Sequence, residues 1–197
     1  MKQTVGILAY GSLIADPGWE IEEVRTRTID GVTTPFPVEY ARSSGGRGAA
    51  PTLVPYEGGG QVRAQVFVLD TSIEDAADRL YRREIGAVGG ERRYKHRANP
   101  GLNKVVVDRL EWAFELDVVL YTRIGATIDN PDATKLAGLA IKSVAQADAG
   151  MDGITYLMNA IEAGIETPLT AAYVDEIRQR TGARDLSDAL TKVKEES

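Results

Sequence analysis

The stretch that most constrains the fold lies near the start of the chain, where a short apolar run opens into glycine and serine. Val5–Ala9 is apolar throughout and short, which predicts a buried strand. The run breaks into Tyr10-Gly11-Ser12-Leu13, and Asp16-Pro17-Gly18 then predicts a turn. Gly11 has no side chain to keep a carboxylate from the backbone N–H groups, and Ser12 adds a hydroxyl. The alternative interpretation is an ordinary tight turn that binds nothing.

Length and charge narrow the classes of protein that this chain can belong to. Its 197 residues suffice for one substantial core, and 43% apolar with 26% charged residues is typical of a globular protein. The net charge of −6 disfavours a nucleic-acid partner, because phosphate groups require a basic surface. The chain has no cysteine and only one histidine, His96, so disulfides, thiolate nucleophiles and metal centres rich in Cys or His are excluded.

The chain shows no targeting or membrane-spanning segment. Lys2 precedes an apolar run of five residues, which is too short for the hydrophobic part of a signal peptide. No run approaches the roughly 18 apolar residues that a membrane span needs. We therefore expect a cytoplasmic protein with no membrane partner.

The next part of the chain reads as extended structure followed by a loop. Residues 21–29 are polar with scattered β-branched residues, and Asp30-Gly31 predicts the turn of a hairpin. Residues 32–40 continue extended, since their two prolines forbid a helix interior. Residues 41–51 form a Gly/Ser loop with Arg42 and Arg47. The loop is either a flexible connector or a place where these arginines contact a substrate carboxylate.

A strand over residues 61–69 leads into a predicted helix from Ile73 to Ile85. Thr71 or Ser72 can cap its start, and Gly86 is the natural stop. Glu84 therefore falls in the last turn. Helix C-termini disfavour a further negative charge, so a desolvated carboxylate there is a better proton acceptor than a solvated one. The alternative for Glu84 is a solvated surface acid paired with arginine.

The remaining chain predicts a basic loop, two strands and a helical region. Residues 86–100 are glycine-rich and strongly basic, which fits either a lid for an acidic substrate or a solvated loop. Residues 105–107 and 116–121 predict core strands, and the Tyr121 phenol can either bind substrate or sit satisfied in the core. Helices are then expected over the following ranges, by their caps and apolar spacing: 130–149, 152–163, from Pro168 to Gly182, and 185–194.

Several short motifs, taken together, resemble the γ-glutamylcyclotransferase superfamily and are most similar to its ChaC-like branch. The motifs are Tyr10-Gly11-Ser12-Leu13 and Arg83-Glu84 followed by Gly89-Gly90. Further matches follow in the same order along most of the chain: Arg47-Gly48, Tyr121 and Tyr156-Leu157. The resemblance implies an α+β fold, a small mixed β-barrel with flanking helices and a helical C-terminal region. It also implies a single domain over 1–197, with a core over 1–125 and a helical extension over 130–197 packed on it.

The resemblance also implies an activity and roles for residues. The expected reaction is intramolecular aminolysis of a γ-glutamyl peptide or amine, which releases 5-oxoproline without a cofactor or metal. Glu84 would be the general acid/base. The backbone N–H groups of Tyr10, Gly11, Ser12 and Leu13 would bind the γ-glutamyl group, with Arg47 and Tyr121 as further substrate contacts. The partner is thus a small-molecule substrate, and the sequence leaves the oligomeric state open.

Two departures and two alternative functions accompany this resemblance. The residues after Ser44 lack the fuller family pattern. ChaC-like sequences usually carry Tyr directly after the Gly-Gly pair, where this chain has Glu91. An acid there would repel the glycine carboxylate of glutathione, so another γ-glutamyl compound is the alternative substrate. A non-catalytic small-molecule binder on the same fold is the second function. A serine hydrolase using Ser12 is the third, although the chain lacks a Gly-x-Ser-x-Gly elbow and offers only His96 as base.

Overall fold

The computed structural model describes residues 3–196 and divides into two compact units. The first contains the residues up to Thr34 and Arg63–Gly125, and we call it the sheet unit. The second contains Pro35–Val62 and the residues from Ala126 onward, and we call it the helical unit. The chain is α+β, as expected. Residues 35–62 group with the C-terminal helices here, and the single-domain organisation stays a prediction.

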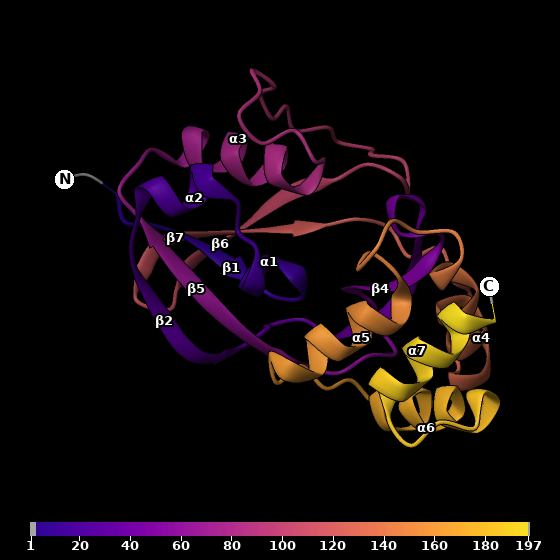
Figure 1. The fold of residues 1–197 in the computed structure, drawn as a ribbon. Coiled ribbons are helices and arrows are strands. Elements are labelled where there is room, and N and C mark those ends of the chain that lie inside the picture. The colour runs from indigo at the N-terminus through magenta and orange to yellow at the C-terminus, as the bar shows by residue number, and fades with distance from the viewer. Residues whose placement is uncertain (1–2, 197) are drawn as a thin grey trace. The chain divides into compact units, whose positions relative to one another are not determined.

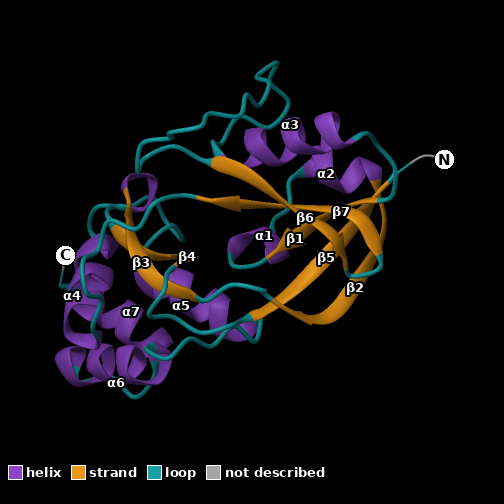
Figure 2. Ribbon diagram, turned by 180° about the vertical axis from the view of Figure 1, so that it is seen from behind, coloured by secondary structure: helices purple, strands orange, loops and turns teal. Residues whose placement is uncertain are grey.

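The sheet unit is built on a mixed five-stranded sheet with strand order β2-β5-β1-β7-β6 (Figure 2). The strands are β1 (Val5–Ala9), β2 (Arg25–Thr33), β5 (Arg63–Leu69), β6 (Val106–Ala113) and β7 (Leu116–Arg123). The central strand β1 is buried along its whole length, which confirms the predicted buried strand. It runs antiparallel to β5 and parallel to β7, with Ile7 opposite both Phe67 and Leu120. Closure of this sheet into a barrel stays a prediction.

The helix α3 (Ile73–Glu84) packs against one face of this sheet (Figure 1). Its Leu80 is fully buried in a cluster with Ile7 and Phe67 of the sheet. The predicted helix is confirmed at both ends. The Ser72 hydroxyl accepts a hydrogen bond from the Asp75 N–H, and Gly86 adopts a φ of 66°, which favours glycine after a helix end.

The polar segment before β2 folds differently from the sequence-based prediction. Trp19–Val24 forms the helix α2, whose Glu20 and Ile21 are buried. Asp30-Gly31 lies inside β2 and not in a hairpin turn, because the pairing with β5 shifts register between Ile29 and Val32. Gly31 has a φ of 71° there, so the glycine permits a bulge in a continuing strand.

The helical unit combines a two-stranded sheet with four helices. The predicted loop over 41–51 is wrong: β3 (Val38–Ser44) and β4 (Ala50–Pro55) pair antiparallel around a short 3-10 turn, η1 (Gly45–Arg47). Cross-strand pairing and burial of Tyr40 and Ala50 outweigh the local Gly/Ser composition. The helices are α4 (Ala133–Val144), α5 (Gly153–Glu162), α6 (Thr170–Thr181) and α7 (Leu186–Glu195).

Local capping residues define most ends of these helices. Asp152 and Asp185 cap α5 and α7, and Gly182 ends α6 with a φ of 60°, as predicted. The first helix is shorter than expected, since Asp132 accepts the Lys135 N–H and the helix ends at Val144. None of the helices in residues 3–196 is long and apolar enough to cross a membrane.

A buried carboxyl joins β3 to the start of α6 within the helical unit. Glu39 is 1% exposed and accepts hydrogen bonds from the Thr167 hydroxyl at 2.6 Å and from the Tyr40 and Leu169 amides. Burial raises the pKa of Glu39 above its ordinary value, although these hydrogen bonds act in the opposite direction. The carboxyl therefore carries a desolvation cost whenever it is ionised.

Replacement of Glu39 by glutamine tests this cost. Because the folded chain binds the Glu39 proton more tightly than the unfolded chain, native stability falls as pH rises from about 4.5 through the raised pKa. Glu39→Gln removes that dependence. The difference in free energy of unfolding, variant minus native chain, should therefore increase as pH rises from about 4.5 to about 7. Urea titrations followed by circular dichroism measure this difference.

The exposed Glu162 of α5 supplies a matched control. Glu162→Gln should track the native chain over the same pH range within about 0.5 kcal/mol. A constant difference between Glu39→Gln and the native chain over this range would contradict the assigned cost of ionising Glu39.

Candidate functional site

The loop after β1 adopts a conformation that requires glycine. Gly11 has φ 61° and ψ −140°, a region of backbone space that residues with a Cβ rarely enter. A short helix, α1 (Ser12–Ala15), follows at once, and the Ser12 carbonyl accepts the Asp16 N–H. The first amides of a helix have no acceptor within that helix, so α1 itself provides no acceptor for the N–H groups of Ser12 and Leu13, and their contact with substrate stays a prediction.

The two residues that flank Gly11-Ser12 are held by the sheet unit itself. The Leu13 side chain is 3% exposed and packs in the same core cluster as Leu80, so only its backbone can contact a substrate. The Tyr10 hydroxyl donates a 2.8 Å hydrogen bond to the Thr122 carbonyl of β7. These contacts fix the loop on both sides of the glycine.

One guanidinium group connects this loop to the end of α3. Arg83 donates from Nη2 to the Ser12 hydroxyl at 3.3 Å and from Nε to the Asp16 carbonyl at 2.8 Å. Its Nη1 lies 2.7 Å from Oε1 of Glu84. The structure thus joins Ser12 and Glu84 through the same guanidinium, while the site roles that the resemblance implies for them stay predictions.

Glu84 itself is neither buried nor fully solvated. It is the last residue of α3, and its side chain is 23% exposed. A partly exposed carboxylate can meet a small molecule at the surface and exchange a proton with it. Its role as general acid/base stays a prediction.

The predicted substrate contact Tyr121 lines a pocket of about 480 Å³ in the sheet unit. The lining residues are Ile73, Ala77, Tyr94, His96, Val107, Asp108, Arg109, Leu120 and Tyr121, and they include neither Glu84 nor the Tyr10–Leu13 loop. Burial raises the pKa of the Tyr121 phenol, and the nearby Asp108 carboxylate raises it further. Tyr121 therefore stays protonated and can donate a hydrogen bond.

Arg47 belongs to the helical unit, and its observed contacts lie within that unit. Its guanidinium lies over the Tyr156 ring, 4.9 Å from the ring centroid, and donates to the Met151 carbonyl at 3.4 Å. A cation–π contact of this kind stabilises a partly buried arginine. These contacts give Arg47 a structural role, while its predicted contact with substrate stays a prediction.

Sequence reasoning missed a buried ion pair beside the candidate site. Arg82 and Glu20 are 8% and 7% exposed. Arg82 donates hydrogen bonds to the Glu20 carboxylate from Nε at 3.0 Å and from Nη2 at 2.7 Å. Glu20 also accepts the Gly89 N–H at 3.0 Å. The hydrogen bond from Arg82 lowers the pKa of Glu20, with the Gly89 amide acting in the same direction.

No local pattern in the sequence predicts the Arg82–Glu20 ion pair. Helical spacing pairs Arg82 with Asp78, four residues earlier, but Asp78 instead accepts the Tyr94 N–H at 2.6 Å. The true partner lies far away in the chain, on α2. Only the packing of α2 against α3 brings the two charges together.

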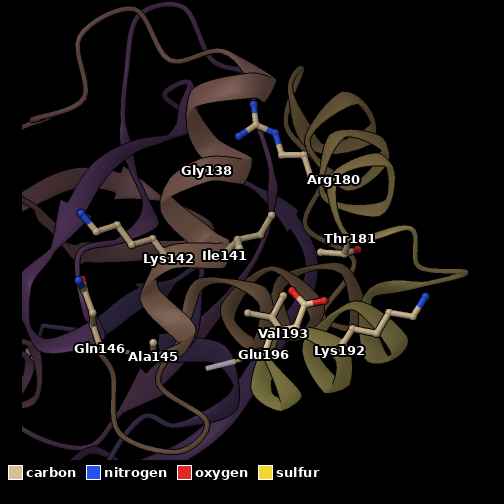
Figure 3. Close-up of a pocket in the computed structure, with 10 residues that line it drawn as sticks. All are labelled: Gly138, Ile141, Lys142, Ala145, Gln146, Arg180, Thr181, Lys192, Val193 and Glu196. Atoms are coloured by element: carbon tan, nitrogen blue, oxygen red, sulfur yellow. The ribbon is translucent and has the colours of Figure 1, made fainter.

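The helical unit also contains a pocket, of about 530 Å³, formed by residues of α4, α6 and α7 (Figure 3). Its cationic side chains do not converge. Lys142 and Lys192 extend on opposite sides of the pocket in Figure 3. Lys192 donates to the Gly182 carbonyl, and Arg180 donates to Glu176. We therefore assign no function to this pocket.

The surroundings of Ser12 and His96 bear on the hydrolase interpretation. The Ser12 hydroxyl is contacted by Arg83, whereas His96 Nδ1 lies 3.4 Å from the Tyr94 hydroxyl. Within residues 3–196 no hydrogen bond joins Ser12 to His96, so the arrangement of a serine nucleophile and its base is not observed. In the same range, no group of three or more His, Cys, Asp or Glu side chains is placed to hold a metal ion.

No protein-family model, curated protein or solved structure matches the chain. What supports a function is therefore the set of short motifs and the geometry at the end of α3.

Replacement of Glu20 by glutamine tests the ion pair that supports the site. The change leaves the buried Arg82 guanidinium without its carboxylate, so we expect the free energy of unfolding to fall by about 3 kcal/mol at neutral pH. Because the pKa of Glu20 is lowered, its contribution is complete above about pH 4.5 and is lost as pH falls further. Urea unfolding followed by tryptophan fluorescence measures both effects.

The more exposed pair of Arg25 and Glu22, whose side chains are 30% and 41% exposed, supplies the control. Glu22→Gln breaks an ion pair of similar length at the surface and should cost less than about 1 kcal/mol. Equal losses in the two variants would show that the Glu20–Arg82 pair contributes no more than a surface pair.

Proposed function

We propose that this chain is a γ-glutamylcyclotransferase-type enzyme that releases 5-oxoproline from a γ-glutamyl peptide or amine. The observation that carries the proposal is the Arg83 guanidinium, which joins the Ser12 hydroxyl to the Glu84 carboxylate. This contact joins two motifs that lie some seventy residues apart in the sequence, which supports their forming one site. The strand-exit loop supplies backbone donors there, and the helix end supplies a carboxylate.

The proposed reaction needs only groups that this site contains. The α-amino nitrogen of the substrate attacks its own γ-carbonyl carbon as a free amine, a C–N bond closes a five-membered ring, and the original amide C–N bond breaks. Glu84 takes the proton that the nitrogen loses on attack and delivers it to the departing amine. Binding the substrate in a folded conformation brings the reacting atoms together, which lowers the entropic part of the barrier.

The backbone of the loop has a separate part in this proposal. The N–H groups of Ser12 and Leu13 hold the γ-glutamyl group, where they stabilise the charge that develops on the carbonyl oxygen. Gly11 permits the close approach, since its conformation and missing side chain leave the amides accessible. Arg83 is a positioning residue, because it holds the Ser12 hydroxyl and the Glu84 carboxylate relative to each other.

The finer fold is part of the same proposal. The mixed sheet with a parallel β1–β7 pair and α3 on one face suits the small β-barrel of the γ-glutamylcyclotransferase superfamily. The substrate proposal also extends beyond glutathione. Glu91 is exposed after the Gly89-Gly90 pair, and a negative charge at this position favours γ-glutamyl compounds that lack a second carboxylate.

Glu84→Gln tests the proposed general acid/base. The native chain is first assayed with glutathione, γ-glutamyl amino acids and γ-glutamyl amines to find its most active substrate. With that substrate, we expect Glu84→Gln to lower kcat for 5-oxoproline release about 10²- to 10⁴-fold. Glu74→Gln is the matched control, because Glu74 is an exposed glutamate on the same helix, and it should retain native kcat. Binding of these compounds with no turnover by the native chain would instead support the alternative, a non-catalytic small-molecule binder.

Ser12→Ala separates the proposed chemistry from hydrolysis by a serine nucleophile. A cyclotransferase loses only a hydroxyl contact with Arg83 and should keep measurable 5-oxoproline release, reduced by about tenfold. If the chain is a serine hydrolase, the native enzyme forms glutamate instead of 5-oxoproline, and Ser12→Ala is inactive because it lacks the nucleophile. Chromatographic identification of the product from both proteins decides between the two reactions.

A further inference from the structure

A small pocket in the sheet unit is lined by cationic side chains and by no acidic ones. Its volume is about 160 Å³, and the cations that line it are Arg93, Lys95, Arg97 and Lys104. Tyr81, Tyr94, Pro100, Val105 and Val106 complete the lining. The volume suits one phosphate or carboxylate group with its solvating waters, since a water molecule occupies about 30 Å³.

The cations of this pocket are exposed, and no carboxylate lies among its lining residues. None of its four cationic side chains forms an ion pair with any of the described residues, whereas Arg79 and Arg82 of the same unit each pair with carboxylates. Residues 91–104 contain five cationic residues and a single acid, Glu91, in a chain whose net charge is −6. Like charges around a small pocket repel one another, and an anion bound there would remove that repulsion.

A larger pocket lies next to the cationic one and shares Tyr94 with it. This is the pocket of about 480 Å³ that Tyr121 lines, and its volume is within the range of small-molecule sites. Its apolar residues come from α3 and the sheet: Ile73, Ala77, Val107 and Leu120. The two tyrosines add aromatic surface, so this pocket suits an apolar or aromatic group.

Tyr94 lines both pockets and has contacts on its backbone, ring and hydroxyl. Its N–H donates to Asp78 at 2.6 Å, and its ring lies 5.5 Å from the Tyr81 ring, centroid to centroid. Its hydroxyl lies 3.4 Å from His96 Nδ1. Contacts on the backbone, ring and hydroxyl leave this side chain little freedom, which pre-organises both pockets around it.

We propose that these two pockets form one binding site for a small molecule with an aromatic body and a single terminal anionic group. The anion lies among the cations of residues 93–104, and the ring lies against Tyr94 and Tyr121. Neither pocket is lined by Glu84 or by the Tyr10–Leu13 loop, so the site is additional to the one proposed for γ-glutamyl chemistry. It does not depend on that chemistry.

Phenyl phosphate is a suitable probe, with inorganic phosphate and phenol as its two halves. We expect amide chemical-shift changes at Tyr94 and Tyr121 with phenyl phosphate, and an affinity at least about tenfold higher than for either half. The affinity should fall as salt is added, because the contact is electrostatic. Absence of binding at millimolar phenyl phosphate, or shifts confined to other residues, would overturn the proposal.

Charge variants identify the contacts. Arg93→Gln with Lys95→Gln should weaken phenyl phosphate binding at least about tenfold. Arg27→Gln with Arg63→Gln removes the same charge at exposed positions of β2 and β5 and should change the affinity by less than about twofold. Equal effects of the two double variants would mean that only net charge matters, which would contradict a defined site.

Two further variants separate the ring contact and the neighbouring chemistry. Tyr121→Leu should weaken phenyl phosphate while leaving inorganic phosphate unchanged, because Tyr121 lines only the larger pocket. Equal loss of both would contradict the proposed division between the pockets. Glu84→Gln should bind phenyl phosphate like the native chain. Loss of binding in that variant would overturn the claim of an additional site, whatever its effect on 5-oxoproline release.

Discussion

The buried ion pair of Arg82 and Glu20 is the interaction on which the arrangement of the sheet unit depends. Two buried charges cost several kcal/mol in desolvation, and only close geometry with further hydrogen bonds offsets that cost. Here the guanidinium contacts both carboxylate oxygens, the Gly89 amide bonds to the carboxylate, and the Arg92 carbonyl accepts from the guanidinium. The pair therefore fixes three segments relative to one another: α2, the end of α3 and the loop that follows.

The direction of Arg82 determines what its neighbour can do. Successive residues on a helix point about 100° apart, so a buried Arg82 turns Arg83 toward the edge of α3. There Arg83 donates hydrogen bonds to Ser12 and Asp16, which precede α2 in the chain. The two neighbouring arginines thus have different roles. Arg82 stabilises the packing, and Arg83 joins the strand-exit loop to Glu84. This coupling explains why a loop from the start of the chain lies at the end of α3.

The sequence predicted those features that neighbouring residues determine and missed those that depend on distant ones. The cap at Ser72, the stop at Gly86 and the helix starts at Asp152 and Asp185 are set by hydrogen bonds or φ values within one turn, and these were correct. The start at residue 130 was not, because Asp132 caps that helix. The strands β3 and β4 were missed because their Gly/Ser turn resembles a flexible loop until the flanking residues pair. Glu20 could not be identified as Arg82's partner, since the nearer Asp78 satisfies the helical spacing. In the candidate site, the resemblance named Ser12 and Glu84 separately, and the Arg83 contact that joins them was not predicted.

The treatment of positive charge differs between the end of α3 and the segment that follows it. At the end of α3, each arginine is matched by a carboxylate or carbonyl, which is the usual outcome when charges stabilise a fold. Ten residues further on, the cations of residues 93–104 surround a pocket without a carboxylate in its lining. Solvation alone explains an exposed lysine, but it does not require four cations to line one cavity beside a fixed tyrosine. The proposed recognition of a negative charge from outside the chain gives this arrangement a physical rationale.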